Sequence, residues 1–126
     1  MSVVMNLNLK ESVHLDRSQF EALYVQLGPT TADKEVNQTL EELAISLANV
    51  QKSHRSGQVE EVRDHVRSLT KIANKLGMTS LGRVARDVLD LSRGHDPAGF
   101  AATLSRLSRI GERSLIAVWD IQDMSV

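Results

Sequence analysis

Residues 58–77, QVEEVRDHVRSLTKIANKLG, carry the clearest pattern in this chain. Their apolar side chains recur every three or four positions and form one stripe, made of Val59, Val62, Val66, Leu69, Ala73 and Leu76. A stripe of this period predicts an amphipathic helix with one buried face. Gly77 is the expected end of the helix, because glycine adopts the left-handed conformation that follows many helices.

The same spacing continues on both sides of this stretch and predicts four further helices. Each is bounded by residues that commonly begin or end helices. The expected start signals are, in chain order, Asp16, Thr30 or Thr31, Thr79 or Ser80, and Asp96 with Pro97. The expected stop signals are Gly28 with Pro29, Ser56 with Gly57, Gly77, and Gly94. The long second helix is expected over about residues 32–54.

These elements predict an all-α fold, an antiparallel up-down four-helix bundle with a short additional N-terminal helix. Short connections make successive helices antiparallel, and no segment alternates as a strand would. Residues 1–14 are expected to form an N-terminal arm with a flexible tail, and residues 15–126 a single domain. The predicted core is Leu40, Leu43, Leu47, Val62, Val66, Leu69, Leu76, Val84, Val88, Leu104 and Leu107.

The composition argues against several classes of protein. The 126 residues include 15 basic and 16 acidic side chains, a net charge of -1, which does not favour nucleic-acid binding. No apolar run has the roughly 18 residues of a membrane span, and no basic stretch opens a secretory signal. Without cysteine there is no disulfide or cysteine metal site, and no two histidines lie one helical turn apart. We expect a cytoplasmic protein without metal or cofactor.

Charge is distributed unevenly along the chain. Residues 1–54 hold four basic and seven acidic side chains, a net charge of -3, and residues 114–126 hold two acidic ones. Residues 55–113 hold eleven basic and seven acidic side chains, a net charge of +4. This middle segment is interpreted either as an ordinary solvated helix surface or as a face for an acidic protein partner.

Residues 66–77, VRSLTKIANKLG, resemble the central motif of the histidine phosphotransfer (HPt) family, Ala-His-x-Leu-Lys-Gly-x-Ala-x-x-Leu-Gly. The apolar frame of the motif is matched by Val66, Leu69, Ala73, Leu76 and Gly77. The flanking helices are similar in order and spacing to those of the family, so the resemblance covers roughly residues 15–118. It implies a four-helix scaffold that meets the receiver domain of a response regulator, or a histidine kinase.

The departures from the motif remove its chemistry. Arg67 occupies the position of the phospho-accepting histidine, Thr70 that of the lysine, and Lys71 that of the small glycine. Arginine stays protonated at ordinary pH and cannot attack an aspartyl phosphate. The resemblance therefore implies a protein that is not an enzyme and that binds its partner without phosphotransfer. Its predicted partner-binding residues are Arg63, Arg67, Thr70, Lys71, Arg83 and Arg86.

Two alternatives stay open. An active phosphotransfer protein would need a displaced acceptor, and His65 is the candidate, although it shares a row with the apolar Leu69 and Leu76. An unrelated helical scaffold would associate with itself, as a homodimer, through the end of the last helix. Residues 115–119 are apolar in every direction there, so Leu115 and Trp119 are the candidates unless the N-terminal arm covers them.

Overall fold

The computed structural model describes residues 12–124, and the regular structure in that range is entirely α-helical. Its helices are α2 (Arg17–Leu27), α3 (Pro29–Arg55), α4 (Val59–Leu76), α5 (Thr79–Leu91) and α6 (Pro97–Met124). Between residues 12 and 124 the only β-type pairing is an isolated antiparallel bridge from Leu15 to Met78. The predicted all-α class is confirmed. Residues 1–11 of the expected arm, and residues 125–126, lie outside the described residues.

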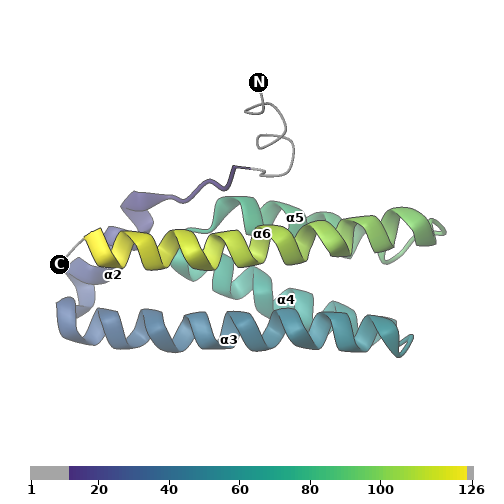
Figure 1. Cartoon of the computed structure of the whole chain (residues 1–126), viewed down its shortest axis with the longest axis horizontal. Helices are drawn as coiled ribbons and strands as arrows, with labels where there is room; N and C mark the ends of the chain where they lie inside the picture. Colours follow the sequence, from purple (N-terminus) through teal and green to yellow (C-terminus); the bar gives the residue numbers. More distant parts are fainter. Residues whose placement is uncertain (1–11, 125–126) are drawn as a thin grey trace, which may run out of the picture.

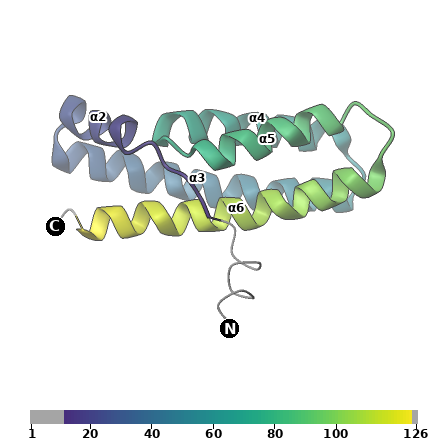
Figure 2. The ribbon, with the colours of Figure 1, turned by 90° about the horizontal axis from the view of Figure 1, so that it is seen from above.

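The four longer helices lie side by side with alternating chain direction (Figures 1 and 2). Helices α3 and α5 run one way, and α4 and α6 run the other. Contacts join α3 to α4, α4 to α5 and α5 to α6, while α6 returns to α3 along a sparser seam. The α3–α6 seam and the α4–α5 seam therefore lie on opposite sides of the molecule, as Figure 2 shows.

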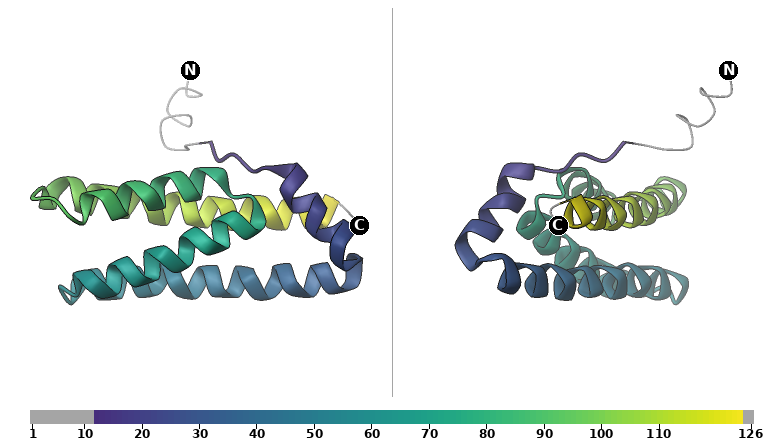
Figure 3. Two further views of the ribbon diagram at one scale, coloured as in Figure 1. Left: turned by 180° about the vertical axis from the view of Figure 1, so that it is seen from behind. Right: turned by 60° about the vertical axis from the view of Figure 1, so that its left-hand side comes forward.

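The short helix α2 crosses the end of this array, where α3 begins and α6 ends (Figure 3). The chain before it is joined to the α4–α5 turn by backbone hydrogen bonds, from Asp16 N to Gly77 O (2.7 Å) and from Thr79 N to His14 O (3.1 Å). Gly77 has a positive φ of 72°, and a Cβ there would lie 2.6 Å from the Asp16 carbonyl oxygen. Glycine is therefore required at this turn by both backbone conformation and space.

The core lies between α3, α4, α5 and α6 and agrees with the apolar stripes of the sequence. All eleven residues of the predicted core are buried. Burial extends beyond them to Phe20 of α2, Met78 of the α4–α5 turn, and Ile110 and Val118 of α6. Removing a Leu or Val side chain from water contributes about 1.5–3 kcal/mol, so this set of residues holds the four helices together.

Two expected helix starts were wrong. Helix α3 begins at Pro29, ahead of the threonines expected to cap it, because the fixed φ of proline suits the first helical position. Helix α5 has Met78 at its N-cap and no side-chain cap. The hydroxyl groups expected to cap it bind the preceding chain instead: Thr79 Oγ1 donates to His14 O, and Ser80 Oγ accepts from His14 N. Asp16 does cap α2, since its carboxylate accepts from Gln19 N at 3.2 Å.

Candidate functional site

Arg63 lies on the row of α4 that faces α5, and its side chain is only 20% exposed. Its Nε donates to Ser92 Oγ (2.9 Å) and its Nη2 to the Ser92 carbonyl oxygen (3.0 Å) at the end of α5. Its Nη1 pairs with Glu60. The guanidinium therefore joins α4 to α5 and offers little of its charge to a partner.

Arg67 lies one turn further along the same row and is placed differently. Its side chain is 51% exposed, and its described ion pair is with Asp64 on the same helix, from Nη1 to Oδ1 at 3.0 Å. An exposed pair of this kind contributes little to stability and is easily exchanged for another partner. Arg67 therefore presents a positive charge to solvent at the position where the resemblance places the phospho-acceptor.

The two other α4 candidates flank Arg67. Lys71, one turn on, is exposed and has no ion-pair partner among residues 12–124. Thr70 is half-buried, and its hydroxyl donates to the Val66 carbonyl oxygen at 3.1 Å, as threonine commonly does within helices. Arg67 and Lys71 thus form the cationic part of the α4 surface, while Thr70 adds a small, satisfied polar group between α4 and α5.

The candidates on α5 lie at the other end of the α4–α5 seam. Arg86 and Arg83 are exposed and line a cavity of about 240 Å³ together with Asn74 and Gly82. A Cβ at Gly82 would lie 3.7 Å from Ala73 Cβ, so the two helices approach closely there. The sequence prediction missed Asn74 and Gly82, because only the antiparallel packing brings them beside Arg86.

His65 lies on the opposite flank of α4, toward α3. Its neighbour one turn earlier, Glu61, accepts a hydrogen bond from Ser53 Oγ of α3 at 3.2 Å. The His65 side chain is half-buried. The imidazole and the Arg67 guanidinium are therefore on different sides of the helix. His65 is the only histidine of α4, so no histidine of this helix lies on the side of Arg67.

The C-terminal candidates line a separate surface. Trp119 is 52% exposed and Leu115 is half-buried, and both border a cavity of about 290 Å³ along the α3–α6 seam. The described part of the expected N-terminal arm, residues 12–14, does not line this cavity. On α3 the cavity is bordered by Leu40, Ala44, Asn37 and Glu41.

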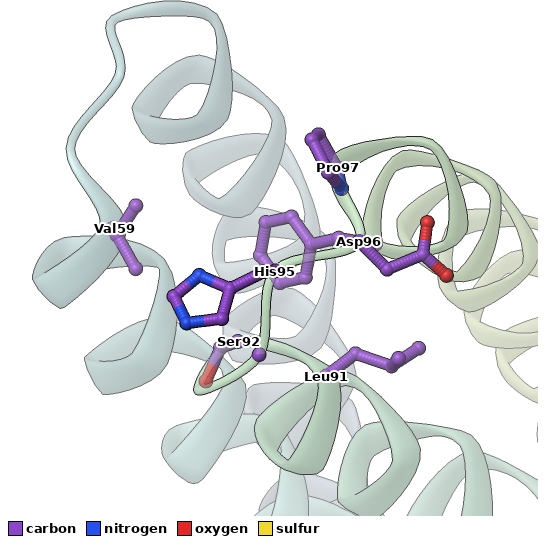
Figure 4. Close-up of a pocket in the computed structure, with 8 residues that line it drawn as sticks. Val59, Leu91, Ser92, His95, Asp96 and Pro97 are labelled. Atoms are coloured by element: carbon purple, nitrogen blue, oxygen red, sulfur yellow. The ribbon is translucent and has the colours of Figure 1, made fainter.

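A cavity of about 330 Å³ opens at the α5–α6 loop, beside the start of α4 (Figure 4). Figure 4 shows the His95 ring directed toward Val59, while the Asp96 carboxylate points away from it. Asp96 instead caps α6, accepting from Gly99 N at 2.9 Å. Histidine and aspartate therefore form no catalytic pair here, although they are adjacent in sequence.

A fourth cavity, of about 390 Å³, lies between α2, the start of α3 and the end of α6. The Tyr24 hydroxyl donates to Asp33 and accepts from Gln122 Nε2 at 3.3 Å. Burial raises the pKa of the Tyr24 phenol above its ordinary value, and the Asp33 carboxylate raises it further. No pattern in the sequence predicted this site, since its residues are far apart in the chain.

Among residues 12–124 no cluster of three potential metal-binding side chains is present, and no helix has the length and apolar character needed to cross a membrane. Comparisons with protein-family models, with curated proteins and with solved structures found no match to this chain.

Proposed function

We propose that this chain is an HPt-like signalling protein of a two-component or phosphorelay system, acting in the cytoplasm as a non-catalytic partner. In this proposal α3 to α6 form an antiparallel up-down four-helix bundle with α2 as the short additional helix. The partner is the receiver domain of a response regulator, or a histidine kinase. No enzymatic step, cofactor, nucleic acid or membrane is involved.

The observation that carries the proposal is the exposure of Arg67, the residue that the resemblance aligns with the phospho-accepting histidine. Its guanidinium stays protonated and cannot take a phosphoryl group. A cation in this position still complements the acidic phosphorylation pocket of a receiver domain. Lys71 extends the positive surface by one helical turn, with no described ion pair to neutralise it.

Arg63 and Arg86 have different roles in this proposal. Arg63 fixes the end of α5 against α4 through Ser92, and so keeps the spacing between the exposed cations of the two helices constant. Arg86, with Arg83 beside it, contacts the rim of the partner from α5. Charge pairing of this kind raises the association rate and the selectivity more than the affinity.

The test is a binding experiment with immobilised receiver domains and histidine-kinase domains from the host organism. The wild-type chain is expected to be retained by at least one of them, and an Arg67→Glu chain to be retained less. Failure of every receiver and kinase domain to retain the wild-type chain would reject the proposal.

A second experiment addresses phosphotransfer. The chain is incubated with a receiver domain phosphorylated on its aspartate, and acid-labile label on the chain is measured. We expect no label on wild type. Label that disappears in His65→Ala would establish the displaced-acceptor alternative instead. A chain that binds no receiver but sediments as a dimer, and loses the dimer in Trp119→Ala, would establish the self-associating scaffold.

A further inference from the structure

The α3–α6 seam is closed at one end and open at the other. Near the α5–α6 loop, Gln51 Nε2 donates to Ser108 Oγ at 2.7 Å. Further along, Gly111 approaches Leu47 so closely that a Cβ would lie 2.7 Å from Leu47 Cδ1. Beyond Gly111 the seam opens into the cavity lined by Leu115 and Trp119, and then into the cavity beside Tyr24. Figure 1 looks onto this side of the molecule.

The open part of the seam is apolar. Trp119, which lines the cavity, and Ile116, three residues before it on α6, are 52% and 51% exposed. Leu115 and Leu40 line the cavity between the two helices. A large aromatic side chain beside exposed aliphatic ones is typical of protein contact surfaces.

The rim of this groove is acidic. The two segments that border it, residues 33–45 and 112–123, hold seven acidic and two basic side chains, a net charge of -5. Glu35 pairs with Lys75 of α4, and Asp33 accepts a hydrogen bond from the Tyr24 hydroxyl of α2. Asp33 and Glu41 on α3, and Glu112, Asp120 and Asp123 on α6, are exposed. The basic residues are Lys34 and Arg113, and Arg17 of α2 borders the far cavity.

We propose that this groove binds a basic amphipathic helix of a partner protein. Apolar side chains of that helix, one turn apart, cover Leu115, Ile116 and Trp119, and its lysine or arginine side chains pair with the carboxylates of both rims. Charge selects this occupant over a second copy of the chain, because a symmetric dimer would place two acidic rims against each other. The surface is independent of the α4–α5 surface on the opposite side.

The test uses the intact chain and two synthetic helical peptides of about 18 residues without tryptophan. Both carry the same leucine stripe, and their polar faces consist of lysine in one and glutamate in the other. Trp119 is the only tryptophan of the chain, so its fluorescence reports directly on the groove. The lysine peptide is expected to move the emission to shorter wavelength and to bind at least about tenfold more tightly than the glutamate peptide.

Matched variants identify the groove as the binding site. Glu41→Lys on the rim is expected to weaken binding of the lysine peptide about two- to fivefold. Asp90→Lys on α5 makes the same change of charge at another exposed position and should leave binding unchanged. Ile116→Ala keeps the reporter and should also weaken binding, while circular dichroism verifies that all three variants are folded.

Three results would overturn the proposal. The first is equal binding of the two peptides, or no movement of the Trp119 emission with either. The second is equal weakening by Glu41→Lys and Asp90→Lys, which would indicate attraction to the whole chain and not to the groove. The third is sedimentation as a dimer with an emission that shifts with protein concentration, since a second copy would then be the occupant.

Discussion

Gly111 of α6 lies against Leu47 of α3 without room for a single additional methyl group. A Cβ at Gly111 would approach Leu47 Cδ1, Cδ2 and Cγ to 2.7, 2.8 and 3.2 Å. Leu47 is buried, so its side chain has little space into which it can rotate. Glycine costs about 1 kcal/mol relative to alanine inside a helix. The close approach of the two long helices explains why this position nevertheless carries glycine.

Gly111→Ala is therefore expected to lower the free energy of unfolding by about 1 kcal/mol, because the cost of overpacking outweighs the gain in helix propensity. Urea denaturation measures the effect. In the Leu47→Ala background the same substitution should become neutral or stabilising, since the obstructing side chain is gone. Additive effects in this double-mutant cycle would show that the two positions do not press on each other.

Substitution of Leu69 tests which face of α4 is buried in the core. The Leu69 side chain is fully buried, so Leu69→Ala should lower the free energy of unfolding by about 2–5 kcal/mol. The control is Ile45→Ala on the exposed face of α3, which should change it by less than about 0.5 kcal/mol. Similar effects of the two substitutions would contradict the assignment of the core.

Arg63 and Arg67 have the same side chain, but their removal is expected to lower stability by different amounts. Arg63→Ala removes two hydrogen bonds to Ser92 and should cost about 1–3 kcal/mol of stability, because the partly buried carbonyl loses its donor. Arg67→Ala removes an exposed pair and should cost less than about 0.5 kcal/mol. Thermal denaturation compares the two variants, and a larger loss in Arg67→Ala would reverse the roles assigned to them.

Tyr24 is the only tyrosine, so its ionisation can be followed by absorbance without interference from other phenols. The midpoint should lie above the ordinary value of about 10, because burial and Asp33 both favour the protonated phenol. Asp33→Asn should lower the midpoint. Gln122→Leu should raise it, since the amide donates to the phenol oxygen.

The sign of the corresponding stability effect follows from the raised pKa. The folded chain holds the Tyr24 proton more tightly than the unfolded chain, so this contribution is fully present below about pH 10. It is lost as pH rises through the raised pKa. Denaturation midpoints of wild type should therefore fall more steeply above pH 10 than those of Tyr24→Phe, and parallel curves would contradict the assignment.

The periodicity of apolar residues predicted the helices and the core, because a helix buries a face that repeats along its own sequence. What the sequence did not predict depends on residues far apart in the chain. The hydroxyl groups of Thr79 and Ser80 resembled caps but bind His14. In the sequence Arg63 resembled a surface cation, but the packing of α5 against α4 places Ser92 within hydrogen-bonding distance of its guanidinium. The described ion pair of Arg67 is instead with Asp64 on its own helix.

Reversing the charges of Arg67 and Lys71 tests the proposed partner surface on α4. Because both side chains are exposed, Arg67→Glu with Lys71→Glu should leave the thermal denaturation midpoint nearly unchanged. At low salt the double variant should bind the captured receiver or kinase domain about tenfold more weakly than wild type, since attraction becomes repulsion. The difference should shrink at about 1 M salt, where charges are screened beyond ~3 Å.

The matched control is Lys34→Glu with Lys52→Glu on α3, which makes the same change of net charge at two other exposed positions. Isothermal calorimetry at both salt concentrations compares the two double variants with wild type. If the control weakens binding as much as the reversal on α4, the loss of binding is caused by the change in net charge and not by contacts of α4. If neither variant weakens it at low salt, the partner does not contact α4, and the acidic groove around Trp119 becomes the surface on which to seek it.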